Sequence, residues 1–496
     1  MEIDEITKIR EEKLKFLEEK GVNPYYNGEK PDITIAEFFK SYDEQVPEGP
    51  THKVAGRIIL MRMHGKAAFA NIKDMSGTVQ IYVRQDAVGP EAYEIFKKAD
   101  IGDIVCVTGH LFKTHKGEVT VQVKKFQMLT KSLLPLPEKW HGITDIELRQ
   151  RKRYLDLLMN DDVKDIFVKR TKVINQIRNF LAAKGFLEVE TPMMQTIPGG
   201  AAARPFKSYH NALDMELYFR IAPELFLKRL LVGGFEKVFE LNRNFRNEGI
   251  STKHNPEFTM LELYAAYNDY LDMMDMTEAI IADVLENVIG KRALEYQGQT
   301  IDFSMPFKRA ELSQINRETV GADYDKKIEH YAKTAKESKY SKYAANEKNS
   351  RLLADILLFE HEVEEKIIQP TFVYNYPSLI SPLARRNDAN PDYSDRFELY
   401  IAGFEVANAY SELNNPLVQE QNFQEQEKNR ASGDLEANMM DMDYIEALRI
   451  GMPPAGGLGI GIDRLMMLLT DQTSIREVIL FPLLKPEAKE PLPAQE

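Results

Sequence analysis

The chain has little cysteine and no long apolar run, and each absence excludes a class of protein. Its 496 residues contain one cysteine, Cys106, so no disulfide can form within the chain and nothing ties it to an oxidising compartment. No apolar stretch approaches the ~20 residues that a membrane helix needs, and the charged residues 1–5 are unlike the start of a signal peptide. We therefore expect a cytoplasmic protein that does not enter a membrane.

Three familiar nucleotide and metal motifs are also missing. No G-x-x-x-x-G-K-[ST] sequence occurs, which excludes a P-loop enzyme. The glycine-rich stretch 456–461 lacks the dinucleotide-binding fingerprint, because the third glycine is replaced by Ile462. Residues 361–365 begin like the zinc motif H-E-x-x-H but have no second histidine, so a solvated helix face explains them better.

Charge is distributed unevenly along the chain. The formal net charge of −13 by itself argues against a nucleic-acid partner. Residues 51–137, however, carry 13 Lys and Arg against 7 Asp and Glu, a local balance of +6 that leaves −19 for the remainder. The pattern indicates a small basic module joined to a large acidic body, although an uneven surface without function would look the same.

The order of local patterns predicts several structural parts. Residues 1–50 form a helical extension, with a charged helix over 4–20 that Gly21 and Pro24 end. Residues 51–137 contain short β-rich runs separated by glycine-containing turns, with a hairpin tip at 113–117, and fit a five-stranded barrel of the OB type. Residues 138–150 form a linker. Residues 151–496 are long enough for one α+β catalytic domain, with a charged, helix-prone peripheral insertion at about 324–350 that shows little apolar periodicity.

Residues 237–264 predict a strand, a loop and a second strand. By alternation, Leu261 and Leu263 face a core, whereas positions 258, 260, 262 and 264 share the opposite face, as do positions 242, 244, 246 and 248 of the first strand. Any half-solvated sheet gives that alternation, but it does not explain why the loop gathers Arg246, Lys253, His254 and Asn255. Arginine neutralises phosphate charge and an aromatic ring can stack on a base, so the cluster suits a nucleotide.

Three stretches resemble, in the same order, the motifs of class II aminoacyl-tRNA synthetases. Residues 185–192 (GFLEVETP) resemble motif 1, which builds the family's dimer interface. Residues 245–248 (FRNE) with 254–258 (HNPEF) resemble motif 2, and residues 457–465 (GLGIGIDRL) resemble motif 3. The basic barrel resembles the anticodon-binding domain of the lysyl, aspartyl and asparaginyl subclass. The resemblance covers nearly the whole chain and implies an OB-fold barrel followed by an antiparallel-sheet catalytic domain flanked by helices, in a homodimer.

The resemblance also implies a site for ATP as co-substrate. Its expected ATP-binding residues are Arg246, Glu248, His254, Asn255, Phe258, Glu398 and Arg464. Arg246 and Arg464 are the expected catalytic charges, and Phe258 and Arg464 would sandwich the adenine.

Glu398 and Glu405 are the expected Mg²⁺ ligands, although two solvated acids are the alternative. Their spacing of seven puts them on opposite faces of a straight strand, so a turn or bulge near Gly403 must intervene.

The nature of the amino-acid substrate depends on two further glutamates. A lysine side chain ends in a cation, and a buried cation needs paired carboxylates, whereas an aspartate pocket would offer Arg or Lys. Glu224 and Glu412 are the candidates. Each alone could be a surface carboxylate, but their contexts at 220–225 and 408–414 resemble those of lysyl enzymes. Lysine as substrate requires that the two lie together, with no basic side chain between them.

Other lysine-binding residues follow from the same resemblance. Tyr264, Asn408 and Tyr410 would line the side-chain pocket, Gly200 and Glu262 would hold the α-amino group, and Arg246 would hold the carboxylate. The stretch departs from the pattern of many bacterial members, which have Gly, Phe and Asp where this chain has Ala409, Tyr410 and Asn415.

On the barrel, Phe69 and Gln80 match positions that contact anticodon bases in the subclass, and Arg62 and Glu118 are weaker candidates. Exposed aromatic rings stack on unpaired bases, so tRNA(Lys) is the expected partner. Phe69 could instead belong to the barrel core, but Lys66 and Lys73 nearby favour a binding surface.

Three rival functions remain open. A lysine ligase that modifies a protein would lack the N-terminal barrel, which this chain has. An aspartyl or asparaginyl synthetase would not need Glu224 and Glu412. A non-catalytic OB-fold nucleic-acid-binding protein would not retain all five of the residues Arg246, Glu248, Glu398, Glu405 and Arg464.

The expected role of Arg246 gives a first prediction. Arg246→Ala should raise the barrier to amino-acid activation by at least ~3 kcal/mol, as the loss of an oxyanion-stabilising donor does. Amino-acid-dependent ATP–pyrophosphate exchange measures the effect, and near-normal exchange by the variant would show that Arg246 does not hold the reacting phosphate.

Overall fold

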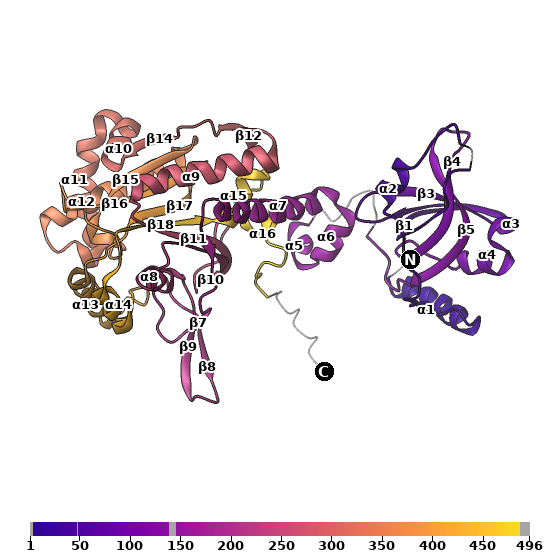
Figure 1. Ribbon diagram of the computed structural model, residues 1–496, viewed down its shortest axis with the longest axis horizontal. Helices are drawn as coiled ribbons and strands as arrows, with labels where there is room; N and C mark the ends of the chain where they lie inside the picture. Colours follow the sequence, from indigo (N-terminus) through magenta and orange to yellow (C-terminus); the bar gives the residue numbers. More distant parts are fainter. Residues whose placement is uncertain (1–2, 47, 138–144, 487–496) are drawn as a thin grey trace, which may run out of the picture. The chain divides into compact units, whose positions relative to one another are not determined.

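The computed structural model describes residues 3–46, 48–137 and 145–486, and the chain divides into two compact units, Met1–Thr144 and Asp145–Glu496 (Figure 1). Most of the predicted linker, residues 138–144, lies outside the described residues. Residue 145 already belongs to the second unit, which begins with α5 (Ile146–Arg151) and α6 (Arg153–Met159).

The first unit is a closed five-stranded barrel with strand order β1-β2-β3-β5-β4. Its strands are β1 (His52–His64), β2 (Ala67–Lys73), β3 (Thr78–Arg84), β4 (Ile104–Lys113) and β5 (Val119–Thr130). Short helices α3 (Gln85–Val88) and α4 (Pro90–Phe96) follow β3. Because β4 and β5 pair as an antiparallel hairpin, the predicted hairpin tip is confirmed, as is the predicted barrel.

The N-terminal helices share the hydrophobic core of the barrel. Helix α1 (Ile3–Glu19) confirms the predicted charged helix, and Gly21 with φ of 70° follows its end. Leu17 of α1 and Phe38 of α2 (Ile35–Lys40) are buried with Val54, Ile81 and Val107 of the strands. The N-terminal segment therefore packs as part of the barrel unit.

An eight-stranded sheet organises the second unit, with strand order β14-β15-β16-β17-β18-β11-β10-β6. The strands are β6 (Leu187–Glu188), β10 (Lys237–Phe245), β11 (Glu257–Ala266), β14 (Lys308–Glu311), β15 (Thr371–Pro377), β16 (Tyr393–Ile401), β17 (Phe404–Ser411) and β18 (Ala455–Gly461). Only the outer pairs β14–β15 and β10–β6 are parallel among its pairings, so the predicted antiparallel sheet is confirmed.

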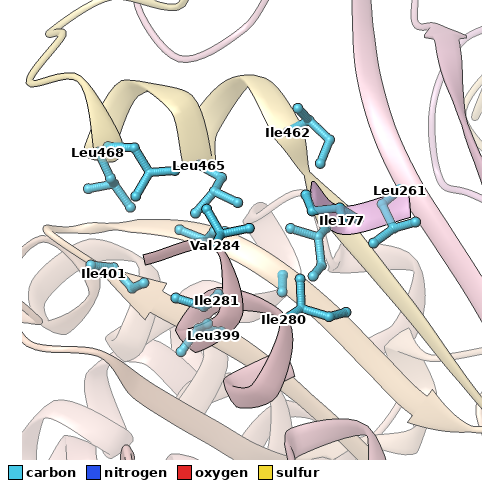
Figure 2. Close-up of a cluster of buried hydrophobic side chains, with 14 of the residues drawn as sticks. Ile177, Leu261, Ile280, Ile281, Val284, Leu399, Ile401, Ile462, Leu465 and Leu468 are labelled. Carbon is cyan, nitrogen blue, oxygen red and sulfur yellow. The ribbon is translucent and has the colours of Figure 1, made fainter. Parts of the chain in front are cut away.

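Helices cover both faces of this sheet. On one face, α7 (Asp161–Ala183), α9 (Tyr270–Val284) and α15 (Ile462–Leu469) bury Ile177, Ile281 and Leu465 against Leu261 and Leu399 of the strands (Figure 2). On the other face, α8 (Glu224–Val232), α13 (Pro416–Ala431) and α14 (Met442–Gly451) pack in a smaller cluster that includes Tyr264. The alternation predicted for β11 is thus confirmed, and the polar site lies on the second face.

Smaller elements complete the second unit. The three-stranded sheet β7-β9-β8 is built from β7 (Met194–Gln195), β8 (Lys207–His210) and β9 (Met215–Phe219), and β12 (Ala293–Tyr296) pairs with β13 (Gln299–Asp302). Helix α10 (Leu312–Val320) precedes α11 (Tyr324–Thr334) and α12 (Glu347–Leu358), and α16 (Ile475–Val478) lies near the end. Every helix of the described ranges is too short or too polar to cross a membrane.

Two local predictions are wrong. Strand β10 ends at Phe245, so Arg246 and Glu248 lie in the following loop and do not continue the strand face. The 324–350 segment has an apolar side after all, since Tyr324 and Ile328 of α11 are buried against α12. It also contributes Lys342 to the larger of the two cavities described below.

The sheet core yields a stability prediction. Leu261 is fully buried between α7, α9 and the strands, so Leu261→Ala should lower the free energy of unfolding of the second unit by about 2–5 kcal/mol. Leu213→Ala is the control, because Leu213 is 66% exposed and its loss should cost less than ~0.5 kcal/mol. Denaturant unfolding of both variants measures the difference, and equal midpoints would contradict the assignment of Leu261 to the core.

Candidate active site

Two adjoining cavities open on the second face of the sheet. The larger, of about 330 Å³, is lined by Glu224, Glu262, Tyr264, Asn408 and Tyr410 among others. The smaller, of about 240 Å³, is lined mainly by the loop between β10 and β11 and the start of α15. Both are bordered by a shared set of residues, Arg246, Met260, Glu405, Asn408 and Gly459. A molecule spanning both would therefore pass Arg246.

The glycines of β18 create the space for the larger cavity. This strand lies between β11 and β17, and the side chains of both neighbours lean across it. A Cβ on Gly457 would lie 1.9 Å from Glu412 Oε1 and 2.6 Å from Tyr264 Cε1. The glycine-rich stretch that fails as a dinucleotide motif is thus needed so that a glutamate and a tyrosine can approach the backbone.

The smaller cavity brings together six of the seven predicted ATP-binding residues, namely Arg246, Glu248, His254, Asn255, Phe258 and Arg464. The Arg464 guanidinium lies 3.0 Å from His254 Nε2 and donates to the Glu405 carbonyl at 2.8 Å. Burial and the nearby arginines lower the pKa of His254, which favours a neutral imidazole. The Arg246 guanidinium lies 5.1 Å from the centre of the Phe258 ring.

The seventh, Glu398, lines the larger cavity beside Glu405. The two carboxylates are brought together by a hairpin: β16 and β17 are joined at Ala402 and Gly403, both with positive φ, and the register shifts between Leu399 and Tyr400. The turn that their spacing required is therefore present.

The electrostatics of this acidic pair favour a cation. Burial and the neighbouring Glu398 carboxylate raise the pKa of Glu405. Arg464 lies 3.2 Å from Glu405, while Glu398 accepts from Arg396 and Tyr400. Within the described ranges no group of three or more His, Cys, Asp or Glu side chains could hold a metal. Two carboxylate ligands nevertheless fit Mg²⁺, which commonly shares its other positions with phosphates and water.

The larger cavity is acidic at one end. The Tyr410 hydroxyl donates to Glu224 Oε1 at 2.7 Å, and the Tyr264 hydroxyl donates to Glu262 Oε2 at 3.3 Å. Burial and the Glu224 carboxylate raise the pKa of Glu262 to about 8. Gly200 also lines this cavity, so seven of the eight predicted lysine-binding residues border it. The Tyr410 hydroxyl, which a phenylalanine at this position would lack, thus holds Glu224.

The prediction for Glu412 is wrong in one respect. Glu412 is buried behind the lining, and a basic side chain does lie between it and Glu224. Lys228 Nζ lies 2.6 Å from Glu224 Oε1 and also forms an ion pair with Glu412 Oε2. The structure therefore does not meet the requirement that no basic side chain lie between the two glutamates. Fully ionised, the three side chains still have a net charge of −1, so their sum attracts a cation.

Sequence reasoning missed several residues that shape these cavities. Lys228 stands four residues after Glu224 in α8, a spacing that places both on one helix face and could have revealed the ion pair. Arg396 contacts Ser381, Glu398 and Asn408. Because it stands two residues before Glu398 in a strand, the two side chains share one face, and this spacing could have predicted their ion pair. Lys342 and Tyr343 carried no local signal, because the fold of the insertion brings them to the cavity.

On the barrel, three of the four predicted anticodon residues, Arg62, Phe69 and Gln80, lie on the neighbouring strands β1, β2 and β3, and Glu118 directly precedes β5. Phe69 pairs in register with Arg62 and Tyr82, and its half-buried ring stacks on Tyr82 with centroids 4.5 Å apart. Phe69 is not part of the barrel's buried core. Gln80 of β3 donates to Glu118 at 2.9 Å, so this polar pair joins β3 to the start of β5.

Comparisons with known proteins agree with this arrangement. A family model described as class II tRNA synthetases (D, K and N) matches residues 145–485, and one described as an OB-fold nucleic acid binding domain matches residues 52–129. Similar curated proteins include the lysine–tRNA ligase of Carboxydothermus hydrogenoformans, 56% identical over 98% of this chain and 99% of that protein. That of Syntrophomonas wolfei is 53% identical over 99% of each chain, and that of Halalkalibacterium halodurans is 49% identical over 97% of each.

The two family models match the two structural units, the barrel and the catalytic unit, and the similar lysine–tRNA ligases align with nearly the whole chain. This chain therefore belongs to the class II lysyl-tRNA synthetases.

Proposed function

We propose that the protein joins L-lysine to tRNA(Lys) at the expense of ATP, through a lysyl-adenylate. One observation carries the proposal: an acidic cavity with a net negative side-chain cluster adjoins an arginine-rich cavity, and Arg246 borders both. The first suits the ammonium groups of lysine and the second suits a triphosphate.

In this proposal the first reaction is activation of lysine. Its carboxylate attacks the α-phosphorus of ATP in line and pyrophosphate leaves, so the protein mainly supplies position and charge. Arg246 holds the substrate carboxylate and neutralises the α-phosphoryl group, and Arg464 with His254 holds the distal phosphates. Phe258 stacks on the adenine. Glu398 and Glu405 hold Mg²⁺, which when bound neutralises phosphate charge.

The second reaction transfers lysine to tRNA. A hydroxyl of the terminal ribose attacks the carbonyl carbon of the adenylate, and AMP leaves. The aromatic face of the barrel, with Arg62, Phe69, Gln80 and Glu118, would bind the unpaired anticodon bases. We further propose that the protein is a homodimer and acts in the cytoplasm.

The substrate can be identified by ATP–pyrophosphate exchange with lysine, aspartate and asparagine in turn. Lysine alone should support exchange, because the net negative cluster matches a cationic side chain and repels a carboxylate. Addition of tRNA(Lys) should then yield lysyl-tRNA. Exchange with aspartate instead, or lysine transfer to a protein but not to tRNA, would contradict the proposal.

Glu262 predicts how lysine binding depends on pH. With a pKa of about 8, Glu262 is mostly protonated at pH 7, and the α-ammonium of lysine would favour its ionised form. Binding must then expel a proton, so lysine affinity should rise between pH 6.5 and 8, by at most about tenfold per pH unit.

Calorimetry in buffers of different ionisation enthalpy measures this proton release. Glu262→Gln should weaken lysine binding and remove its share of the pH dependence. Glu257→Gln, an exposed position on the same strand, is the matched control and should behave as the unaltered protein does. A pH slope unchanged by Glu262→Gln would show that another group takes up the proton.

A further inference from the structure

A buried ion triad stands behind the acidic end of the larger cavity. It consists of Glu224, Lys228 and Glu412, and the exposed fraction of Lys228 is 0%. Its ammonium also lies 5.5 Å from the centre of the Tyr410 ring, and Tyr410 donates to the same Glu224 oxygen that Lys228 contacts. Of the triad, only Glu224 lines the cavity. A ligand would therefore contact Glu224 directly, and Lys228 and Glu412 would affect it through their interaction with Glu224.

The charge of this triad is set by Lys228. Burial opposes the charged form of Lys228, but the two carboxylates outweigh it and raise its pKa, so Lys228 is a cation at neutral pH. Burial raises the pKa of Glu412 well above its ordinary value, and the ion pair with Lys228 opposes that rise by favouring the ionised form. The titratable groups that act on the ammonium are Glu224, Glu412 and Tyr444, together with the Tyr410 ring that lies against it.

We propose that Lys228 is a positioning and specificity residue, which holds Glu224 in place and limits the pocket to one unit of negative charge. This inference rests on the proposed lysine site. With the triad at −1, a single ammonium neutralises the pocket, whereas a neutral side chain leaves a buried charge unmatched. The α-ammonium and carboxylate of the substrate are matched separately by Glu262 and Arg246.

Lys228→Met removes the cation while keeping an unbranched side chain of similar length. The pocket then holds two carboxylates with no cation between them, which would share one proton at a net charge of −1. Lysine must displace that proton from Glu224, which has also lost the ammonium that held it in place. We expect KM for lysine to rise about tenfold or more, with KM for ATP within about twofold of the unaltered protein. The preference for lysine over norleucine, which lacks the ammonium, should fall by a similar factor.

A charge-restoring double variant makes the test specific. Glu412→Gln alone should also reduce the preference for lysine, because it brings the triad to neutrality. Lys228→Met combined with Glu412→Gln leaves Glu224 as the one carboxylate, ionised and with no partner to share a proton, so the preference for lysine should recover above that of either single variant. A merely structural role for Lys228 predicts the reverse, with the double variant worst.

Arg229→Met is the matched control, since Arg229 follows Lys228 in α8 but pairs with Asp441 and Asp443 outside the triad. It should leave the lysine-to-norleucine preference unchanged. If Lys228→Met does not fold, the same preference measured for Glu412→Gln alone decides the matter, and an unchanged value would overturn the inference. Absence of lysine-dependent exchange in the unaltered protein would instead refute the proposed function.

Discussion

Buried carboxylates on one face of the catalytic sheet need matching positive charge, and much of the site follows from that requirement. Glu224 and Glu412 are matched in part by Lys228, Glu398 by Arg396, and Glu405 by Arg464. Taking a carboxylate out of water costs several kcal/mol unless a cation or donors replace the water, so the buried Glu224 and Glu412 depend most on their ion pairs with Lys228. The matching is incomplete, and the remaining negative charge is what can attract a cationic substrate.

The sheet makes such a concentration of charge possible. Strands β11, β18 and β17 lie side by side, and the middle strand is mostly glycine. Polar side chains from its two neighbours can therefore occupy the space above it, as the contact expected between a Gly457 Cβ and Glu412 shows. The opposite face of the same strands is apolar and packs against α7, α9 and α15, which anchors the site on a rigid layer.

Sequence reasoning succeeded where local pattern and local chemistry coincide. Alternation in 257–264 placed Leu261 and Leu263 in the core, and the seven-residue spacing of Glu398 and Glu405 required the turn that Ala402 and Gly403 form. It failed where a side chain's partner is distant in the sequence. The insertion could not be connected with the cavity, since Lys342 reaches it only through the packing of α11 and α12.

The sequence by itself determined the two-part architecture, the order of the motifs and the family, because periodicity and motif spacing are local properties of the chain. Only the tertiary structure decided which charges meet. Glu412 is separated from Lys228 by 184 residues and from Glu224 by 188, and their contact depends on where the fold places the residue that follows β17 relative to α8. Electrostatic energy depends on the distance between charges and on their burial, and the order of residues in the sequence specifies neither directly.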